Sequence, residues 1–337
     1  MISKWEKEMK KLRRYNFKKL FLSIIIATLF LSAAPASAAD KPKSTGINVT
    51  YRSAKQIKSF VKKHKFNLNG KVKMSKKPSI KSPYSLGTVS KSSLNDGLNA
   101  LNTMRYIAGL PANVTLDSSY TKMCQAATVV NAANNQLSHF PSKPKKMKTS
   151  LYELGKEGAG SSNLAWASRQ TSLSYSVVRQ WMEDGDSFNI DRVGHRRWIL
   201  NPPMKKTGFG YANSYSAMYA FDSSNSNANY YGVTWPAQNM PVKYFGSEYP
   251  WSISMGEPID DTSKVKVTLK RKSDNKTWTF SEKSAKGYFN INNDGYGQTG
   301  CIIFRPNKIS YKSGDTFQVT ITGLKNKVSY QVKFFSL

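Results

Sequence analysis

The chain has 337 residues, with 51 Lys and Arg against 20 Asp and Glu, and its formal net charge is +31. Hydrophobic residues make up 39% of it and include seven Trp and 18 Tyr, so the composition excludes a wholly disordered chain. The length favours two folded units with tails, and the charge favours anionic partners such as cell-wall polyanions, acidic lipid surfaces or nucleic acid. A strongly charged surface can also serve solubility alone.

Residues 1–39 have the pattern of a secretory signal peptide. The basic opening KKLRRYNFKKL leads into the apolar run FLSIIIATLFL, and the small residues SAAPASAAD follow. The apolar run has about 11 residues, whereas a membrane-spanning helix needs about 20, so no transmembrane anchor is expected. Cleavage near Ala36-Ser37-Ala38 would give a secreted protein with a net charge of about +25, because the removed segment holds eight Lys and Arg and two Glu.

Residues 40–90 are expected to form a mobile basic arm or linker. They contain 13 Lys and Arg against one acidic residue, and their apolar residues are too sparse for an independent core. Such an arm would lie on an anionic surface or act as a solubilising spacer. His64, inside it, is expected to be solvated.

Residues 91–240 are expected to form helices followed by strands. The apolar residues of SLNDGLNALNTM have helical spacing, and Asp117 can cap a second helix. SYSVVRQWMEDG and GHRRWIL predict two further short helices, the last of which ends at a Pro-Pro pair. TGFGYANSYSAMYAFD and ANYYGVTWPA alternate as strands do. Because the helices precede the strands, the predicted fold class is α+β.

Residues 241–337 are expected to form an all-β sandwich of immunoglobulin-like shape, after a boundary at WPAQNMP. Its strands recur about every ten residues with turn residues between them. They are VKVTLKR, KTWTF, KGYFNI, CIIFRP, FQVTITG and VSYQVKFF. Cys124 and Cys301 then fall in different domains, so each is expected to be free and buried. A secreted protein without disulfides fits bacterial export.

His139 and His195 are the candidate functional residues of the helical part. Neutral imidazole is the commonest protein ligand for metals such as zinc, and Glu183 or Asp184 could add a carboxylate. The alternative is that each histidine lies at a helix end and bonds to a backbone carbonyl. The spacing of the two histidines does not decide between these interpretations.

Five motifs follow one another between about residues 92 and 236: LNALNTMRYIAGLP, LSHFPSKP, GSSNLAWAS, WMEDG, and GHRRWIL followed by GFGYA. In this order and spacing they resemble the CAP superfamily of cysteine-rich secretory proteins, antigen 5 and pathogenesis-related 1 proteins, also called the SCP domain. The resemblance implies an α-β-α sandwich with an open cleft, in which two histidines and two acidic residues meet and can hold a divalent metal such as zinc. By motif position the histidines are His139 and His195, and "WIL" after the second would anchor its turn in the core.

The chain departs from the family pattern in this cleft. Ser162 stands where the family often has the acidic residue of a GEN motif, and a hydroxyl is a poor substitute for a carboxylate ligand. The remaining acid is Asp184 or Glu183, so metal binding by His139 and His195 is expected to be weak. The predicted cleft residues are His139, Ser162, Asn163, Glu183, Asp184, His195 and Arg196.

The expected function is that of an extracellular binding module attached to a cell wall or another surface, with an anionic polymer as partner. The alternatives are a metal-assisted or serine-dependent hydrolase of wall peptide or a similar polymer, and a lipid-binding carrier. Lipid and a protein are the alternative partners to the anionic polymer. The hydrolase would use His139, His195, Ser162 and Asp184. Specific nucleic-acid recognition is not expected, because the basic residues lie in the arm and not in a recognised reading motif.

Overall fold

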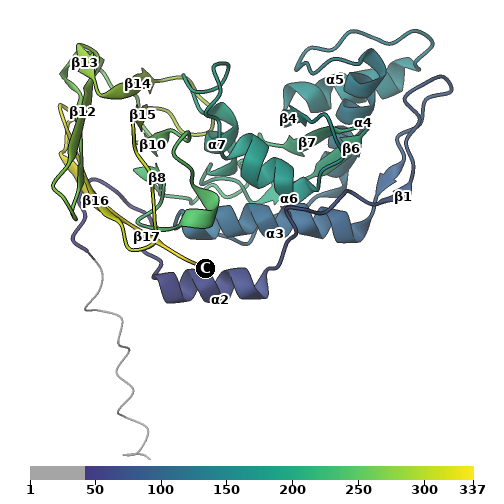
Figure 1. Cartoon of the computed structure of the whole chain (residues 1–337). Coiled ribbons are helices and arrows are strands. Elements are labelled where there is room, and N and C mark those ends of the chain that lie inside the picture. Colours follow the sequence, from purple (N-terminus) through teal and green to yellow (C-terminus); the bar gives the residue numbers. More distant parts are fainter. Residues whose placement is uncertain (1–41) are drawn as a thin grey trace, which may run out of the picture. The chain divides into compact units, whose positions relative to one another are not determined.

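The computed structural model describes residues 42–337, and the predicted signal peptide lies outside the described residues. Lys43–Leu337 form one unit. Figure 1 shows a mixed α+β fold with helices and a small sheet in one half and two larger sheets in the other. Within residues 42–337, no helix has the length and apolar character that a membrane crossing needs.

The helical half contains a three-stranded antiparallel sheet between two layers of helices (Figure 1). The strand order is β4-β7-β6, with bounds Ser162–Trp166, Tyr215–Tyr219 and Phe209–Ala212. One face carries α4 (Ser118–Asn134) and α5 (Thr149–Gly160), and the other carries α3 (Lys91–Ile107), α6 (Leu173–Tyr175) and the π-helix η1 (Ser176–Trp181). Side chains of β7 point alternately to the two layers of helices. Ala217 packs with Cys124 of α4, and the next residue, Met218, belongs to the apolar cluster that includes α3.

Side-chain caps start α3, α4 and α6. Asp117 accepts hydrogen bonds from the backbone of Ser119 and Tyr120, so the predicted cap of α4 is confirmed. Helix α7 (Gly194–Ile199) and the short strands β3 (Thr115–Leu116) and β5 (Lys206–Thr207) complete this half.

Helix α5 was not predicted, because it meets α4 through glycines and not through an apolar stripe. A Cβ on Gly158 would lie 2.2 Å from the carbonyl oxygen of Met123.

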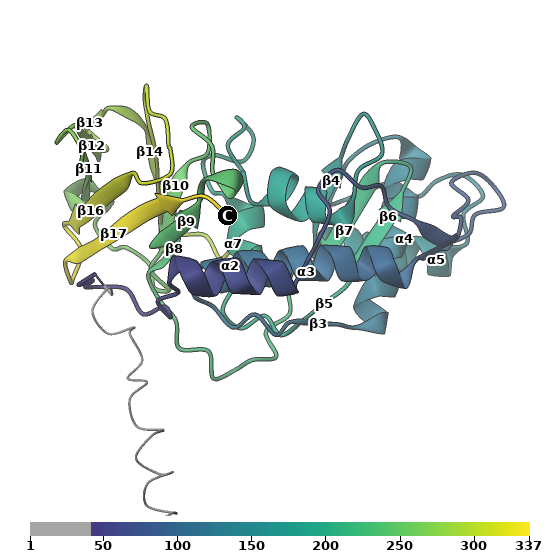
Figure 2. The same ribbon diagram turned by 60° about the horizontal axis from the view of Figure 1, so that its bottom comes forward.

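The segment 42–90 differs from the expected mobile arm. It forms α2 (Ala54–Lys63) and the paired strands β1 (Met74–Lys76) and β2 (Thr88–Val89), and a capping box of Ser53 and Gln56 starts the helix. Ile57 is fully buried, and α2 lies alongside α3 in Figures 1 and 2. The few apolar residues of this segment thus pack into the core around α3 and do not form a separate core. His64 is also engaged, because its ring stacks on Phe60.

The C-terminal half is a sandwich of two sheets. One has the order β14-β15-β10-β8 and the other β13-β12-β11-β16-β17-β9, and all pairs are antiparallel except β17 with β9. Aromatic side chains join the sheets, with ring centroids of Trp251 and Phe317 5.7 Å apart and those of Phe280 and Phe304 5.1 Å apart. The bounds are β8 Val233–Trp235, β9 Asn239–Pro241, β10 Trp251–Ser254, β11 Lys266–Arg271, β12 Thr277–Ser281, β13 Ser284–Ala285, β14 Gly287–Asn292, β15 Cys301–Pro306, β16 Thr316–Thr322 and β17 Val328–Phe335, with 3₁₀ turns η2 at Val242–Tyr244 and η3 at Thr262–Lys264.

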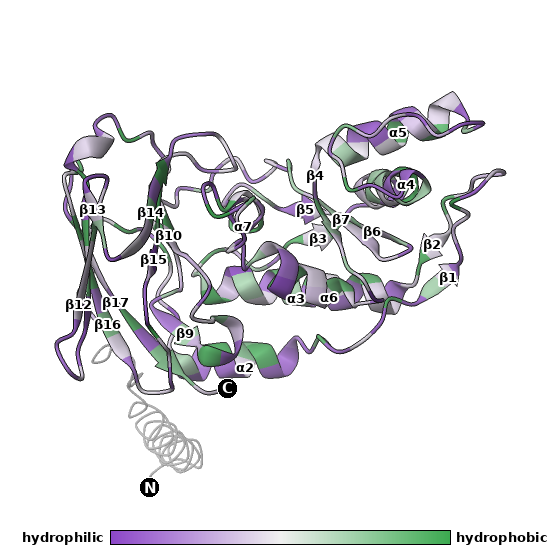
Figure 3. Cartoon of the chain, turned by 45° about the horizontal axis from the view of Figure 1, so that its top comes forward, coloured by the Kyte–Doolittle hydropathy of each residue, from purple (hydrophilic) through white to green (hydrophobic). Residues whose placement is uncertain are grey.

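The two halves share strands and a core. The sandwich begins with β8 and β9, before and across the expected boundary at residue 240, and Thr45 bridges to Ser329 of β17. One cluster of buried apolar side chains contains Leu101 and Trp181 from the helical half and Trp251 from the sandwich. Figure 3 shows hydrophobic segments in α3 and in the neighbouring strands β10 and β15 of the sandwich. The two halves are therefore joined by a common apolar core as well as by the covalent chain.

Candidate functional site

His195 lies in the first turn of α7 and is paired with a buried carboxylate. Its Nδ1 is 2.8 Å from Oδ1 of Asp184, whose side chain is fully buried, and Oδ2 of Asp184 accepts from the backbone N–H of Arg196 at 2.9 Å. Because a carboxylate accepts, Nδ1 carries a proton, and in the neutral imidazole the lone pair is then on Nε2. The imidazole side chain is 19% exposed. The ring of His195 is therefore held in one orientation by Asp184 and is accessible to solvent.

His139 is held by a backbone carbonyl. Its Nδ1 donates to the carbonyl oxygen of Ala159 at 2.8 Å, which again leaves Nε2 with the lone pair. Partial burial of the ring lowers the pKa of His139, the hydrogen bond to Ala159 raises it in part, and the nearby His195 and Arg192 lower it further. The two histidines are thus close enough to interact electrostatically. At neutral pH His139 is uncharged.

Asn163 of β4 joins this pair. Its Nδ2 donates to the backbone oxygen of His195 at 2.9 Å, and the neighbouring Leu164 carbonyl accepts from the indole N–H of Trp181 at 3.1 Å. These bonds connect the central sheet with α7 and η1. Hydrogen bonds thus join three of the predicted residues, namely Asn163, Asp184 and His195, and His139 interacts with His195 electrostatically.

Ser162 points elsewhere. Its hydroxyl lies 3.5 Å from Sγ of Cys124 in α4, and the residue is only 4% exposed. Successive residues of a strand face opposite sides, so Ser162 faces α4 when Asn163 faces α7. Burial raises the pKa of Cys124 to about 12, so its thiol stays protonated. The contacts of Ser162 do not form a serine–histidine nucleophile.

Glu183 and Asp184 have different surroundings. Tyr249 donates to Oε1 of Glu183, and Arg179 lies 3.5 Å from the same oxygen. Burial raises the pKa of Glu183, and burial with the adjacent Glu183 raises the pKa of Tyr249 to about 12. Of the two acidic candidates, Asp184 is the one that binds His195.

Arg196 does not face the histidines. It is fully buried and donates to the carbonyl oxygens of Met182 at 2.8 Å and Pro250 at 2.7 Å, as well as to the hydroxyl of Ser252 at 3.1 Å. Burial lowers its pKa to about 10, which still leaves it charged at neutral pH. Arg196 therefore ties the turn of His195 to β10 of the sandwich.

Gly194 and Arg197, which flank His195 and Arg196 in the sequence, also contact the sandwich. Arg197 donates to Oδ1 of Asn292 at 2.6 Å and to the backbone oxygen of Gln298. A Cβ on Gly194 would lie 2.9 Å from the ring of Tyr296, so the glycine allows this close approach. In "GHRR", the histidine is bound to Asp184 and the other three residues contact the second half.

The rest of the motif is only partly as expected. Ile199 and Leu200 are buried, whereas Trp198 is half-buried and stacks near Phe221, with ring centroids 4.6 Å apart. Sequence reasoning did not find Tyr249 or the loop 292–298 as partners of these residues. No local pattern signals such contacts, because they join segments that lie 50 to about 100 positions apart.

The donor set does not complete a metal site. A structural or catalytic zinc site needs three or four protein ligands. Within residues 42–337, no group of three or more His, Cys, Asp and Glu side chains is arranged to hold a metal ion. The two Nε2 atoms are available, but Asp184 is bound to His195 and Ser162 faces Cys124. The residues present therefore do not fit a zinc ion of the usual coordination.

Comparison with known proteins agrees with the sequence motifs. Residues 98–235, less than half of the chain, match the family model of the Cysteine-rich secretory protein family, CAP. The match supports the resemblance to the CAP superfamily over these residues, which contain His139 and His195. No curated protein and no solved structure matched the chain.

Proposed function

We propose that this protein is a secreted binding module of bacterial type that attaches to an anionic cell-wall polymer through a basic strip. The basic strip is a set of exposed lysines with no acidic residue between positions 41 and 95. This surplus of exposed cations is the observation that carries the proposal. Its twelve members are Lys43, Lys55, Lys58, Lys62, Lys63, Lys65, Lys71, Lys73, Lys76, Lys77, Lys81 and Lys91.

The packing of α2 holds part of the basic strip in a fixed array. Lys55, Lys58 and Lys62 recur at helical spacing on the exposed side, while Ile57 is buried on the other, and the exposed Lys65 follows just after the helix. In Figure 3 α2 accordingly carries both hydrophobic and hydrophilic segments. Fixed lysines lose less conformational freedom on binding than lysines of a mobile arm would, which favours attachment.

The strength of such attachment comes from the number of lysines that bind the polymer at the same time. A single exposed ion pair contributes less than about 1 kcal/mol, but several act together along a repeating anionic chain. Salt screens exposed charges over about 8–10 Å, so attachment should weaken as ionic strength rises. In this proposal the sandwich, which we take to be immunoglobulin-like, supports the helical half at the wall.

One observation favours a second function. The pair of His195 and Asp184 resembles the histidine and its orienting acid in hydrolytic sites, so His195 could act as a general base on a bound wall polymer. In this second function the nucleophile would be a water molecule, and neither Ser162 nor a metal ion would take part.

One experiment compares the two functions. Purified cell walls are sedimented with the full chain at low and high salt, and soluble products are assayed in the same tubes. We expect retention that fades with salt and no released product. Changing Lys55, Lys58, Lys62 and Lys65 to Gln should raise the apparent Kd at least about tenfold.

The matched control changes Lys266, Lys270, Lys272 and Lys283 to Gln, which removes the same charge from exposed positions of the sandwich. Equal loss in both variants would reject the basic strip as the attachment surface. Fragments that are released by the wild type and not by His195→Ala would establish the hydrolase instead.

A further inference from the structure

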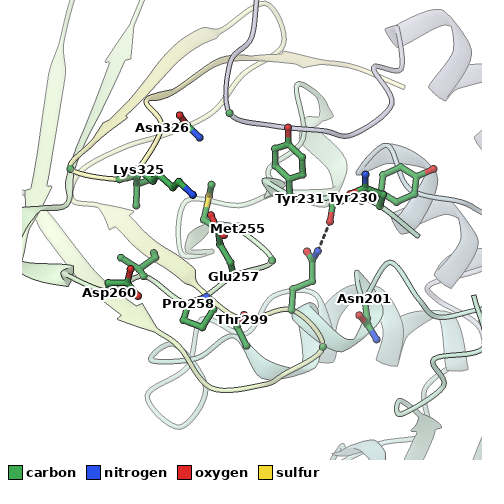
Figure 4. Close-up of a pocket in the computed structure, with 18 of the residues that line it drawn as sticks. Asn201, Tyr230, Tyr231, Met255, Glu257, Pro258, Asp260, Thr299, Lys325 and Asn326 are labelled. Carbon is green, nitrogen blue, oxygen red and sulfur yellow. Dashed lines mark hydrogen bonds between the residues drawn. The ribbon is translucent and has the colours of Figure 1, made fainter. Parts of the chain in front are cut away.

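A cavity of about 1360 Å³ lies at the junction between the end of α7 and the sandwich. We call it the junction cavity (Figure 4). Asn201, Tyr230 and Tyr231 line it from the helical half and the segment after it, and the sandwich contributes the loops 255–261, 297–299 and 323–326. None of the residues that line it belongs to the group around His139 and His195.

Two hydrogen-bond acceptors at one end of the junction cavity have no donor within residues 42–337. Asn201 is 5% exposed, and its Oδ1 has no hydrogen-bond partner among the described residues. Gln298 donates from Nε2 to the backbone oxygen of Tyr230 at 2.6 Å, the bond dashed in Figure 4, but its buried Oε1 is also unpaired in the described part of the chain. Buried acceptors without donors are unfavourable. A ligand that supplies N–H groups would satisfy these oxygens once the two amide side chains turn toward it.

The position of this end is fixed by the fold. Arg105 donates to the backbone oxygen of Asn201 at 2.7 Å, and Gly297, which has a φ of 78°, packs over the Asn201 side chain. Because Oδ1 is covered, its amide group must turn for a ligand to reach it. Figure 4 shows Asn201 across the junction cavity from Asp260 and Lys325.

The exposed charges of the junction cavity oppose those of the whole molecule. Asp261 is paired with Lys264 at 2.9 Å, while the carboxylates of Glu257 and Asp260 have no hydrogen bond or ion pair among the described residues. Lys325 is the remaining cation of the lining. The junction cavity thus has an excess of one negative charge on a chain whose net charge is +31. Tyr231, 43% exposed, adds an aromatic face that suits a cation.

We propose that the junction cavity binds a cationic peptide segment. An ammonium or guanidinium group would lie between Glu257 and Asp260, and peptide N–H groups would reach Asn201 and Gln298. An anionic ligand is disfavoured by the two free carboxylates and by the unpaired acceptors. This inference does not depend on the proposed attachment of the basic strip to a wall polymer.

The test uses acetyl-trilysine amide as probe and the full chain labelled with [¹³C]methyl-methionine. Met255 lines the junction cavity, and its signal is assigned with Met255→Leu. We expect a saturable shift of the Met255 methyl signal, and no shift with the same peptide acetylated on its three lysines. Nonspecific attraction cannot produce this result, because probe and protein are both strongly positive.

Substitutions of opposite sign make the test specific. Glu257→Gln with Asp260→Asn should raise the Kd about tenfold, whereas Lys325→Gln should lower it about threefold. Glu153→Gln on α5, an exposed position outside the junction cavity, should leave the Kd unchanged. The proposal is overturned if trilysine does not shift Met255, or if the carboxylate and lysine variants bind it as the wild type does.

Discussion

Neighbouring residues of "GHRR" have unrelated tasks in this protein. His195 binds Asp184, while Arg196 is fully buried and bonded to Pro250 and Ser252 of the second half. The same division occurs in β4, where Asn163 reaches α7 and Ser162 contacts Cys124. A residue in this site is therefore defined by the direction of its side chain, which changes from one position to the next.

The pKa of His139 gives a prediction at this scale. Partial burial keeps the ring neutral, so His139 should titrate below the ordinary histidine value of about 6.5. The unfolded chain then binds the proton more readily, so this contribution to stability is present above about pH 6.5 and is lost as the pH falls from there through the lower pKa of the folded state. Solvent screens the partly exposed ring, and the loss should stay below about 1 kcal/mol.

The measurement is an NMR titration of the histidine C2 protons, with His139→Gln to assign the signal, and urea unfolding at pH 7.5 and 5. His139→Gln should lose less stability on acidification than the wild type. A pKa at or above 6.5 for His139 would contradict the assigned environment.

Helix α2 shows how an element with few apolar residues becomes part of a core. It buries Ile57 completely, and the backbone beyond it is fixed by bonds such as Val72 N–H to the carbonyl of Thr171 at 3.1 Å. Lys58 lies over the ring of Phe335 at 5.8 Å, so the helix also contacts the end of β17. An amphipathic helix of this kind is stabilised mainly by tertiary packing.

Ile57→Ala is the corresponding prediction for this element. Removal of a buried isoleucine side chain should reduce the free energy of unfolding by about 2–5 kcal/mol. Ser59→Ala, an exposed change in the same helix, should stay within about 0.5 kcal/mol of the wild type. Urea unfolding of the full chain measures both. An Ile57→Ala protein as stable as the wild type would show that α2 is not part of the core.

The two halves of the whole molecule are joined by buried polar bonds and by one apolar cluster. Arg196 and Arg197 reach into the sandwich, and Arg305 of β15 donates back to the carbonyl of Gly185 at 3.0 Å. Strands β8 and β9 come from the segment that follows the central sheet. Separate unfolding of either half would expose these groups, so the halves should unfold together.

Arg196→Met tests this coupling. The wild type should show one unfolding transition, with tryptophan fluorescence and far-ultraviolet circular dichroism coincident. The variant leaves the carbonyl oxygens of Met182, Glu183 and Pro250 without the donor that Arg196 supplies, and it should lose about 3–5 kcal/mol. Arg271→Met, which removes an exposed pair with Asp274, should cost at most about 1 kcal/mol. Two separated transitions in the wild type would disprove the coupling.

The sequence by itself determined the elements whose signals are local. Asp117 as cap, the apolar spacing before Gly109, the turn at Gly194 and six strands of the sandwich could be predicted, because capping and periodicity depend on nearby residues. The motifs also identified the segment that the CAP family model matches, and with it His139 and His195. That both cysteines are free was predicted from their distance along the chain.

Only the tertiary structure decided which side chains meet. In β4 the side chain of Ser162 points to the face opposite the histidines and contacts Cys124. Strand β10 and the loop 292–298 provide hydrogen-bond acceptors for Arg196 and Arg197. Packing against a neighbouring core ordered the segment 42–90, although its own composition could not. Such contacts depend on long-range packing, whose partners share no local pattern, and for this reason the sequence predicted the parts and the fold decided the site.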